Sequence, residues 1–183
     1  MKFKYTKEES EHLFFTSDLH FDHANIIKYC NRPYSSVEEM NQTLITNWNE
    51  VITDDDTVFI LGDVTWGNNT DLIGYIEQMK GHKILIKGNH DKKLQKTICD
   101  KLFDFTCDQL RLTIDGKHVI LNHYPFLCFA EDIQLFGHIH SGPGSTSHDL
   151  DKYMNCGNLN QLDVGVDNMN YKPVSWKEIL EMV

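Results

Sequence analysis

The sequence lacks the features of exported and membrane proteins. No apolar run in its 183 residues approaches the roughly 18 that a membrane helix needs, and the Lys-rich start is not followed by the apolar segment of a signal peptide. The five cysteines are scattered and never form a C-x-x-C pair, which argues against a disulfide framework or a structural zinc knuckle. We therefore expect buried thiols in a cytoplasmic protein that does not use a membrane.

Basic residues are also scarce. Lysine and arginine together number 17 against 27 acidic residues, so the formal net charge is -10, and no basic stripe runs along the chain. Because a long phosphate backbone is held by rows of basic side chains, duplex nucleic acid is a poor candidate partner. A small phosphate ester is compatible with this charge, since a metal centre supplies positive charge that the count omits. No feature of the sequence assigns an oligomeric state.

Short β-branched and aromatic runs predict strands over residues 12–17, 57–61, 83–87, 110–114, 119–122 and 133–136. Apolar residues at spacings of three and four predict a helix over 36–52, with Ser35 and Glu38 as its capping box. Further helices are predicted over 69–80, from about residue 91, and after residue 173, where Ser175 and Glu178 suit a second capping box. Asp115-Gly116 predicts a hairpin.

Together these elements predict one α/β (α+β) layered domain with mixed sheets, spanning residues 1–183. A hydrophobic content of 40% with 24% charged residues indicates a globular protein with a real core. The last helix is expected to bury Ile179, Leu180 and Met182. Residues 141–160 are rich in Gly, Ser and Asn and predict a long surface loop.

Residues that can bind metals follow five of the predicted strands: Asp18 and His20, Asp63 after Gly62, Asn89-His90-Asp91 after Gly88, His123, and His138 and His140 after Gly137. Asp18 and His20 are two residues apart, so an extended backbone would send both side chains to one face. Each motif alone has an explanation in turn chemistry, but their ordered combination indicates a metal site. Nitrogen and oxygen donors suit Mn, Fe, Zn, Ni or Co and do not choose between them.

The order D-x-H, G-D, G-N-H-D, single His and G-H-x-H resembles the signature of the calcineurin-like metallophosphoesterase superfamily. The segments 164–167 and 172–175 resemble the closing strand and helix of its small bacterial and phage-type members. The resemblance implies a four-layer α/β/β/α sandwich, in which two mixed β-sheets flanked by helices hold metals along one edge. It implies two divalent metal ions, one bound by Asp18, His20 and His140, the other by Asn89, His123 and His138, with Asp63 bridging. It places His90 beside the leaving group and Asp91 where it orients His90.

Charge arithmetic supports these roles. Two divalent ions carry four positive charges, Asp18 and Asp63 cancel two, and a bridging hydroxide cancels a third, leaving about one positive charge to face a phosphate. Metal binding lowers the pKa of water toward about 7, so the expected reaction is attack by a hydroxide that bridges the two metals. His90 is expected to protonate the leaving group; the alternative is a packing role.

The residues around these motifs favour phosphodiesters. Asp91 replaces the Glu of Ser/Thr phosphatases, and Asp63 is followed by a different sequence, residues 64–67, so the chain looks closer to the phosphodiesterase and nuclease branch. Because no large cap is evident, we expect a small nucleotide or cyclic nucleotide diester as substrate. Trp66, Tyr34 or Tyr124 is available for base stacking.

His23 and Arg32 are predicted to contact this substrate, because both lie in irregular segments shortly after the first motif. The alternatives are a capping histidine and a solvated loop arginine. Two other functions stay open: a phosphomonoesterase acting on small phosphorylated metabolites, and a non-catalytic scaffold with the same fold. The presence of every expected ligand argues against the scaffold.

Overall fold

The computed structural model describes residues 3–67, 69–142 and 160–183. Its strands are β1 (Lys4–Tyr5), β2 (Leu13–Thr16), β3 (Thr57–Ile60), β4 (His82–Ile86), β5 (Phe105–Cys107), β6 (Gln109–Ile114), β7 (Lys117–Asn122), β8 (Ile133–Phe136), β9 (Gln161–Asp163) and β10 (Val174–Ser175). Its helices are α1 (Lys7–Ser10), α2 (Ala24–Tyr29), α3 (Val37–Val51), α4 (Asn69–Ile76), the 3-10 helix η1 (Asp91–Lys93), α5 (Lys96–Leu102) and α7 (Trp176–Met182).

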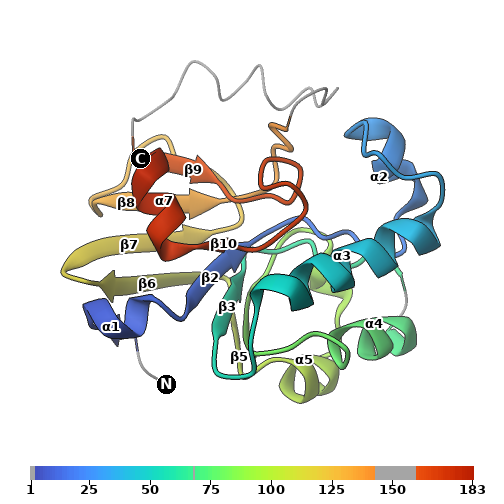
Figure 1. The fold of residues 1–183 in the computed structure, drawn as a ribbon, viewed down its shortest axis with the longest axis horizontal. Helices are drawn as coiled ribbons and strands as arrows, with labels where there is room; N and C mark the ends of the chain where they lie inside the picture. Colours follow the sequence, from blue (N-terminus) through green and yellow to red (C-terminus); the bar gives the residue numbers. More distant parts are fainter. Residues whose placement is uncertain (1–2, 68, 143–159) are drawn as a thin grey trace.

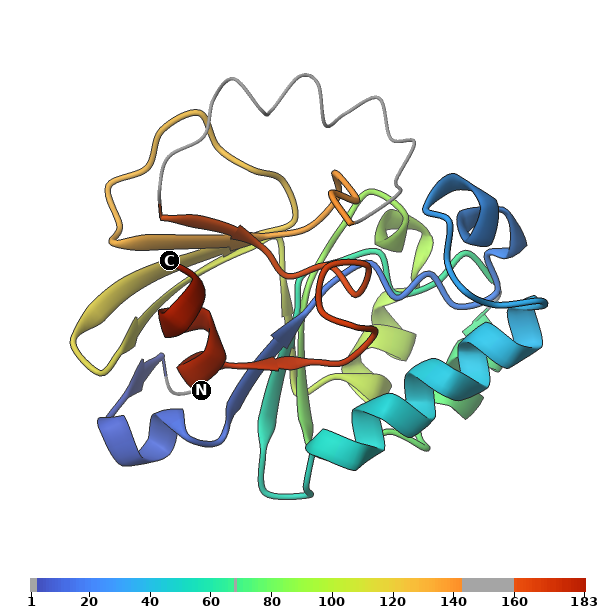
Figure 2. The same ribbon diagram turned by 45° about the horizontal axis from the view of Figure 1, so that its top comes forward.

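The strands form two mixed sheets that pack against each other (Figure 1). One sheet has the order β1-β6-β7-β8-β9, in which β6 and β7 pair antiparallel and the other pairs are parallel. The other has the order β10-β2-β3-β4-β5, in which only β10 pairs antiparallel. Figure 2 shows α3 and α7 toward opposite sides of the molecule. The predicted pair of mixed sheets flanked by helices is confirmed.

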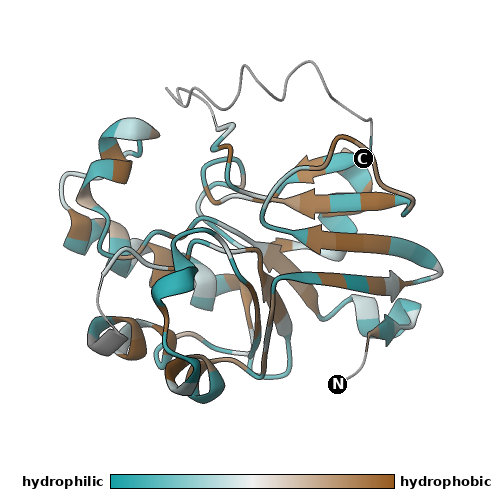
Figure 3. Cartoon of the chain, turned by 180° about the vertical axis from the view of Figure 1, so that it is seen from behind, coloured by the Kyte–Doolittle hydropathy of each residue, from teal (hydrophilic) through white to brown (hydrophobic). Residues whose placement is uncertain are grey.

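Strand β3 is apolar on both faces because each face is covered. Val58, Phe59 and Ile60 of β3 are all fully buried, as expected for a central parallel strand. Phe59 stacks on Phe15 of β2 with ring centroids 5.2 Å apart, in the core between the sheets. Val58 and Ile60 belong to a second core that includes residues of α3, α4 and α5. Figure 3 shows the resulting hydrophobic strands.

Helix α3 begins one residue later than its predicted capping box implies. The Ser36 hydroxyl accepts the Glu39 backbone N–H at 3.1 Å, so Ser36 and not Ser35 is the N-cap. The sequence Ser35-Ser36 with Glu38-Glu39 suits either register locally. Burial of the apolar face of α3 settles the register, because its inward residues must meet the sheet.

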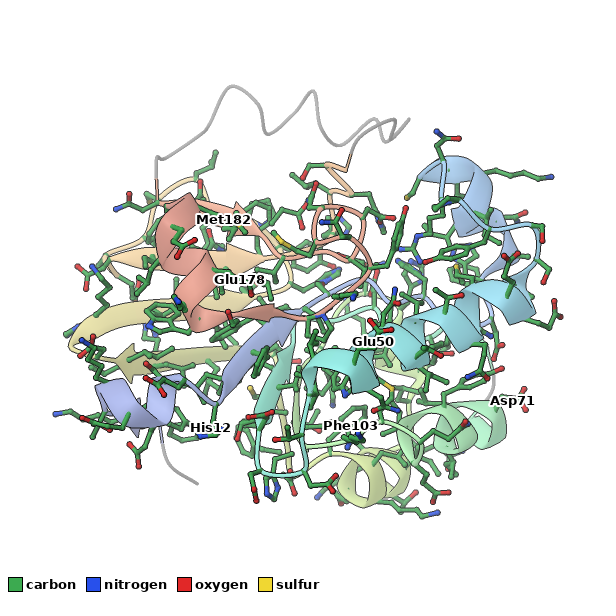
Figure 4. All side chains as sticks on the ribbon, viewed as in Figure 1. His12, Glu50, Asp71, Phe103, Glu178 and Met182 are labelled. Carbon is green, nitrogen blue, oxygen red and sulfur yellow. The ribbon has the colours of Figure 1, made fainter. Side chains whose placement is uncertain are left out.

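The other predicted helices differ mainly at their ends. The helix predicted over 69–80 ends at Ile76, and the one predicted near residue 91 is the 3-10 helix η1 followed by α5. At α7 the capping box of Ser175 and Glu178 is present as predicted. Met182 differs: it is 51% exposed at the end of α7, near Glu178 in Figure 4, so it does not join the buried face.

The hairpin at Asp115-Gly116 is confirmed: both residues have positive φ, at 49° and 81°, and Ile114 pairs with Lys117 across it. The predicted closing strand is shifted, since β9 covers 161–163 and residue 165 makes only an isolated bridge to Ser17. The pattern does not predict β1, α1, α2 or β5, which are too short to show periodicity.

Most of the loop predicted over 141–160 lies outside the described residues. Among the residues that are described, no helix has both the length and the apolar character of a membrane span.

Candidate metal centre

The ends of five strands bring the predicted ligands together. Strands β2, β3 and β4 run parallel in one sheet, and β7 and β8 run parallel in the other. A bridge between Ser17 and Gly165 links the segments that leave β2 and β9. Since the carboxyl ends of parallel strands meet at one edge, residues that follow them become neighbours. The two clusters described next are built from these residues.

Asp18, His20 and His140 form the first cluster, in which one potential ligand atom of each residue lies within 4.8 Å of the others. His20 Nε2 and His140 Nε2 both lie 3.9 Å from Asp18 Oδ1. The second cluster is Asp63, His123 and His138, with the same spacing limit. The first cluster is the set that the resemblance assigns to one metal, and the second contains two ligands assigned to the other metal together with Asp63, the expected bridge.

Asn89 and Asp63 complete the arrangement around His123. The side-chain oxygen of Asn89 lies 3.0 Å from His123 Nε2. Asp63 Oδ2 lies 3.5 Å from His123 Nε2 and 3.7 Å from His20 Nε2, so this one oxygen faces both clusters. That is the position a bridging carboxylate requires.

Two buried atoms of the first cluster test whether a cation fits. Asp18 Oδ1 and His20 Nε2 have no hydrogen-bond partner among the described residues, although both side chains are buried. Buried polar atoms of folded proteins nearly always have a partner, because leaving one unpaired costs about 1–3 kcal/mol. A divalent cation that accepts a lone pair from each atom removes both penalties. The residues present therefore fit a metal ion.

The ligand segments have a backbone that the extended prediction misses. Asp18 and His20 have φ of 58° and 54°, and His138 and His140 have φ of 73° and 49°, so neither pair lies on an extended strand. Asp63 has a φ of 54° as well. Such left-handed conformations are uncommon for residues with a side chain and persist only where the surroundings enforce them. Their concentration in the ligand segments marks this edge as functional.

Hydrogen bonds between the motifs enforce this backbone. The Asp18 N–H donates to the Gly62 carbonyl and the His20 N–H to the Asp63 carbonyl, each at 3.0 Å. The other carboxylate oxygens of Asp18 and Asp63 accept further backbone hydrogen bonds. Asp18 Oδ2 accepts the His138 N–H at 2.9 Å. Asp63 Oδ1 accepts a backbone N–H in the same way, again at 2.9 Å. Each carboxylate thus holds a neighbouring loop with one oxygen and keeps the other for a cation.

Asp91 is predicted to orient His90, but its hydrogen bonds go to backbone N–H groups of the loops after β3 and β4. Its buried carboxylate accepts the N–H of Gly88 at 2.8 Å, of Asp63 at 2.7 Å and of Val64 at 3.0 Å. Because both oxygens are used this way, Asp91 joins the turn after β3 to the turn after β4. Its contacts make it a positioning residue for Asp63.

The imidazoles are oriented by their Nδ1 atoms. His123 Nδ1 lies 2.8 Å from the Leu61 carbonyl, and His140 Nδ1 lies 3.0 Å from Asp167 Oδ2. A donor role at Nδ1 leaves Nε2 free to bind a metal. The sequence motifs do not include Asp167, but its position shortly after β9 is the same signal that singled out Asp18 and Asp63.

The carboxylates hold protons on two imidazoles. Burial disfavours a charged ring, but the hydrogen bond with Asp63 and the charge of Asp18 outweigh it and raise the pKa of His123 to about 9. At His140, burial is again outweighed, and Asp18 and Asp167 raise its pKa to about 11. A divalent cation must displace these protons to bind, which is the usual behaviour of histidine ligands.

His90 and His23 border the first cluster on its open side. His90 Nε2 lies 3.7 Å from Asp63 Oδ2, and its side chain is 29% exposed. The His23 ring stacks on Trp66, 4.4 Å away at 13°, and its Nδ1 lies 3.3 Å from His20 Nδ1. Burial and the neighbouring His90 lower the pKa of His23 to about 4, so this ring is neutral at pH 7. Both residues are partly exposed, and their rings lie beside that of His20 in the first cluster.

Two of the three proposed stacking residues lie at the centre. Trp66 is 47% exposed, and its ring lies 4.5 Å from that of His90. The Tyr124 ring lies 4.6 Å from that of His138. Tyr34 is partly buried and packs instead against Tyr171 beside the core, with ring centroids 5.3 Å apart.

Arg32 is not a solvated or substrate-facing residue. Its guanidinium is buried, where it pairs with Asp167 and donates to the Asp18 carbonyl at 2.7 Å and to the Leu19 carbonyl at 3.0 Å. This burial contradicts the predicted contact with a substrate. Arg32 does lie in the irregular segment before α3, but its side chain is part of the protein interior.

Gly137→Ala is expected to disrupt the centre. A Cβ at Gly137 would lie 2.0 Å from Ser17 Oγ and 2.4 Å from Asp18 Oδ2, so Asp18 must move. We expect a loss of about 1–3 kcal/mol in the free energy of unfolding together with weaker metal binding. Thermal unfolding with and without Mn(II) measures both effects. The control is Gly74→Ala in α4, where a Cβ meets no atom within 4 Å, and unchanged metal binding in the Gly137 variant would contradict the expectation.

Comparisons with known proteins agree with this geometry. A family model described as calcineurin-like phosphoesterase matches residues 12–177. The chain is 37% identical over 174 residues to the uncharacterized protein MJ1445 of Methanocaldococcus jannaschii, with 93% of this chain and 90% of that protein covered. It is 31% identical over 201 residues to the Gene 66 protein of Mycobacterium phage L5, with 92% of each chain covered.

A solved structure gives the same result for the fold. AQ665 from Aquifex aeolicus, a protein of unknown function, superimposes with a TM-score of 0.73 and 26% identity, over 93% of this chain and 98% of that one. The resemblance seen in the order of the motifs is confirmed by the family model, which matches most of the chain. The chain belongs to the calcineurin-like phosphoesterase family.

Proposed function

We propose that this phosphoesterase hydrolyses small phosphodiesters, of the nucleotide or cyclic nucleotide type, at a pair of divalent metals. Asp18, His20 and His140 would hold one metal and Asn89, His123 and His138 the other, with Asp63 between them. The observation that carries the proposal is the position of Asp63 Oδ2, 3.7 Å from His20 Nε2 and 3.5 Å from His123 Nε2.

When bound, the metal pair supplies Lewis acidity and lowers the pKa of water toward about 7, which makes hydroxide available at neutral pH. The chain supplies the remaining functions. The partly exposed ring of His90 lies beside Asp63, where its Nε2 can give a proton to the departing oxygen. His23, neutral and stacked on Trp66, forms a wall of the site and can donate or accept a hydrogen bond.

The placement of the arginines favours a diester over a monoester. A monoester carries up to two negative charges and is commonly clamped by a bidentate guanidinium. Arg32 is buried in its pair with Asp167, and Arg111 pairs with Glu131 on β6 and the loop before β8. The Arg32 guanidinium is therefore not available to a phosphate, and that of Arg111 lies on β6 in its pair with Glu131. A diester carries a single negative charge, so it needs fewer positively charged side chains in addition to the metals.

Matched model substrates test this function. With Mn(II), we expect bis-p-nitrophenyl phosphate to be hydrolysed about an order of magnitude faster than p-nitrophenyl phosphate. The rates are measured from the absorbance of the released nitrophenolate at 405 nm. A chelator should abolish both activities, and added Mn(II) should restore them. Faster monoester hydrolysis would indicate the alternative phosphomonoesterase, and activity that survives complete metal removal would exclude the metal mechanism.

A further inference from the structure

A buried ion pair lies behind the first metal cluster. Arg32 Nε donates to Asp167 Oδ1 at 2.8 Å and Arg32 Nη2 to Asp167 Oδ2 at 3.1 Å, a bidentate pair. Their side chains are 0% and 3% exposed. Arg32 follows α2 and Asp167 follows β9, so the pair joins segments 135 residues apart in the chain.

The same pair touches the cluster at two points. Asp167 Oδ2 accepts a hydrogen bond from His140 Nδ1 at 3.0 Å. Arg32 donates to the carbonyls of Asp18 and Leu19, at 2.7 Å and 3.0 Å, and so holds the segment in which Asp18 has its left-handed backbone. The pair therefore orients one ligand ring and supports the backbone of another ligand.

The second cluster is oriented differently. His123 Nδ1 faces the Leu61 carbonyl at 2.8 Å, a neutral acceptor within the protein backbone. A carboxylate that accepts from Nδ1–H makes the opposite nitrogen a stronger ligand than a carbonyl does, because the negative charge raises the basicity of the ring. His140 and His123 are thus oriented by acceptors of different charge.

We propose that Arg32 and Asp167 are positioning residues that selectively strengthen the metal site of Asp18, His20 and His140. Asp167 holds the His140 ring with Nδ1–H directed away from the site and Nε2 toward it. Arg32 keeps the carboxylate aligned and holds the Asp18 backbone. A buried ion pair is weak support for stability, since desolvation offsets most of its attraction, so positioning is the better account of its presence.

This inference rests on the metal pair of the proposed function, but its test does not depend on any substrate. Asp167→Asn removes the negative charge with little change in shape. We expect one Zn(II) of the pair to bind about 10- to 100-fold more weakly, while the other binds as in the unaltered protein. Equilibrium dialysis against Zn(II), with metal analysis of the protein, measures the two affinities.

Two variants control for a general loss of structure. Glu131→Gln removes the partner of Arg111, the chain's other arginine, from a surface pair and should leave both Zn(II) sites unchanged. Arg32→Lys keeps the charge but cannot form the bidentate pair with Asp167 and also donate to both carbonyls, so it should weaken the same site as Asp167→Asn. Melting curves of the metal-free variants show whether they fold. A folded Asp167→Asn protein that binds two Zn(II) ions with unaltered affinity would overturn the proposal.

A measurement on the unaltered protein covers the case in which both variants fail to fold. In the Zn(II)-loaded protein, ¹H–¹⁵N spectra of the histidine rings should show His140 protonated at Nδ1 and metal-bound at Nε2. The opposite tautomer would refute the positioning role. If the protein binds two Zn(II) ions as described but hydrolyses no phosphodiester, the proposed function fails and this inference stands.

Discussion

Asp63→Asn is expected to reduce phosphoester hydrolysis by more than about a hundredfold, because changes in residues that only support metal ligands already cost about 10- to 100-fold. Asp63 Oδ2 faces both clusters, 3.7 Å from His20 Nε2 and 3.5 Å from His123 Nε2. The substitution removes its charge while it keeps the shape, and asparagine tolerates the φ of 54° found here. The loss should therefore come from the metals and not from the backbone.

The measurements are Mn(II) content per chain and the rate with bis-p-nitrophenyl phosphate. We expect both to fall together. Asp115→Asn is the matched control, because Asp115 also has a positive φ, of 49°, but is exposed in the hairpin between β6 and β7. An Asp63 variant with full metal content and unaltered activity would rule out the bridging role.

His90→Asn should lower the rate by about 10²- to 10⁴-fold for a diester with a poor leaving group, the range typical of a lost general acid. The loss should be much smaller with p-nitrophenolate as leaving group, because that anion departs without a proton. Metal content should stay as in the unaltered protein, since His90 belongs to neither ligand cluster. This combination separates proton donation from metal binding.

His82→Asn is the control for His90. His82 begins β4, whereas His90 follows the other end of that strand. The His82 side chain is 64% exposed and lies beside Asp104. We expect this variant to retain full activity. Equal losses for good and poor leaving groups in the His90 variant would argue against proton donation and for the packing alternative.

Much of the site could be anticipated from strand ends. The apolar runs before Asp18, Asp63 and His123 are local signals, because a short run rich in β-branched and aromatic residues predicts a strand. Parallel strands then place their following residues along one edge. The motifs therefore indicate which residues meet, even though the backbone of Asp18 and His20 is left-handed and not extended as the spacing suggests.

The roles of Arg32, Asp91 and Asp167 could not be anticipated in this way. Arg32 appears as a loop residue near the first motif, but its guanidinium is buried against Asp167. Asp91 follows His90 directly, yet its carboxylate binds backbone N–H groups from the turn after β3. These partners of Arg32 and Asp91 are distant in the chain, so the residues next to them in the sequence do not predict these contacts.

The amino-acid order thus specifies the longer strands, the longer helices and the ligand types, because periodicity and turn chemistry act over a few residues. The supports of the ligands depend on contacts between distant segments, such as the bond from Arg32 to Asp167 across 135 residues. Burial turns an apparently free arginine into an ion-pair partner, because a desolvated charge must be paired. Such pairing follows from how the two sheets close on each other, which no local pattern encodes.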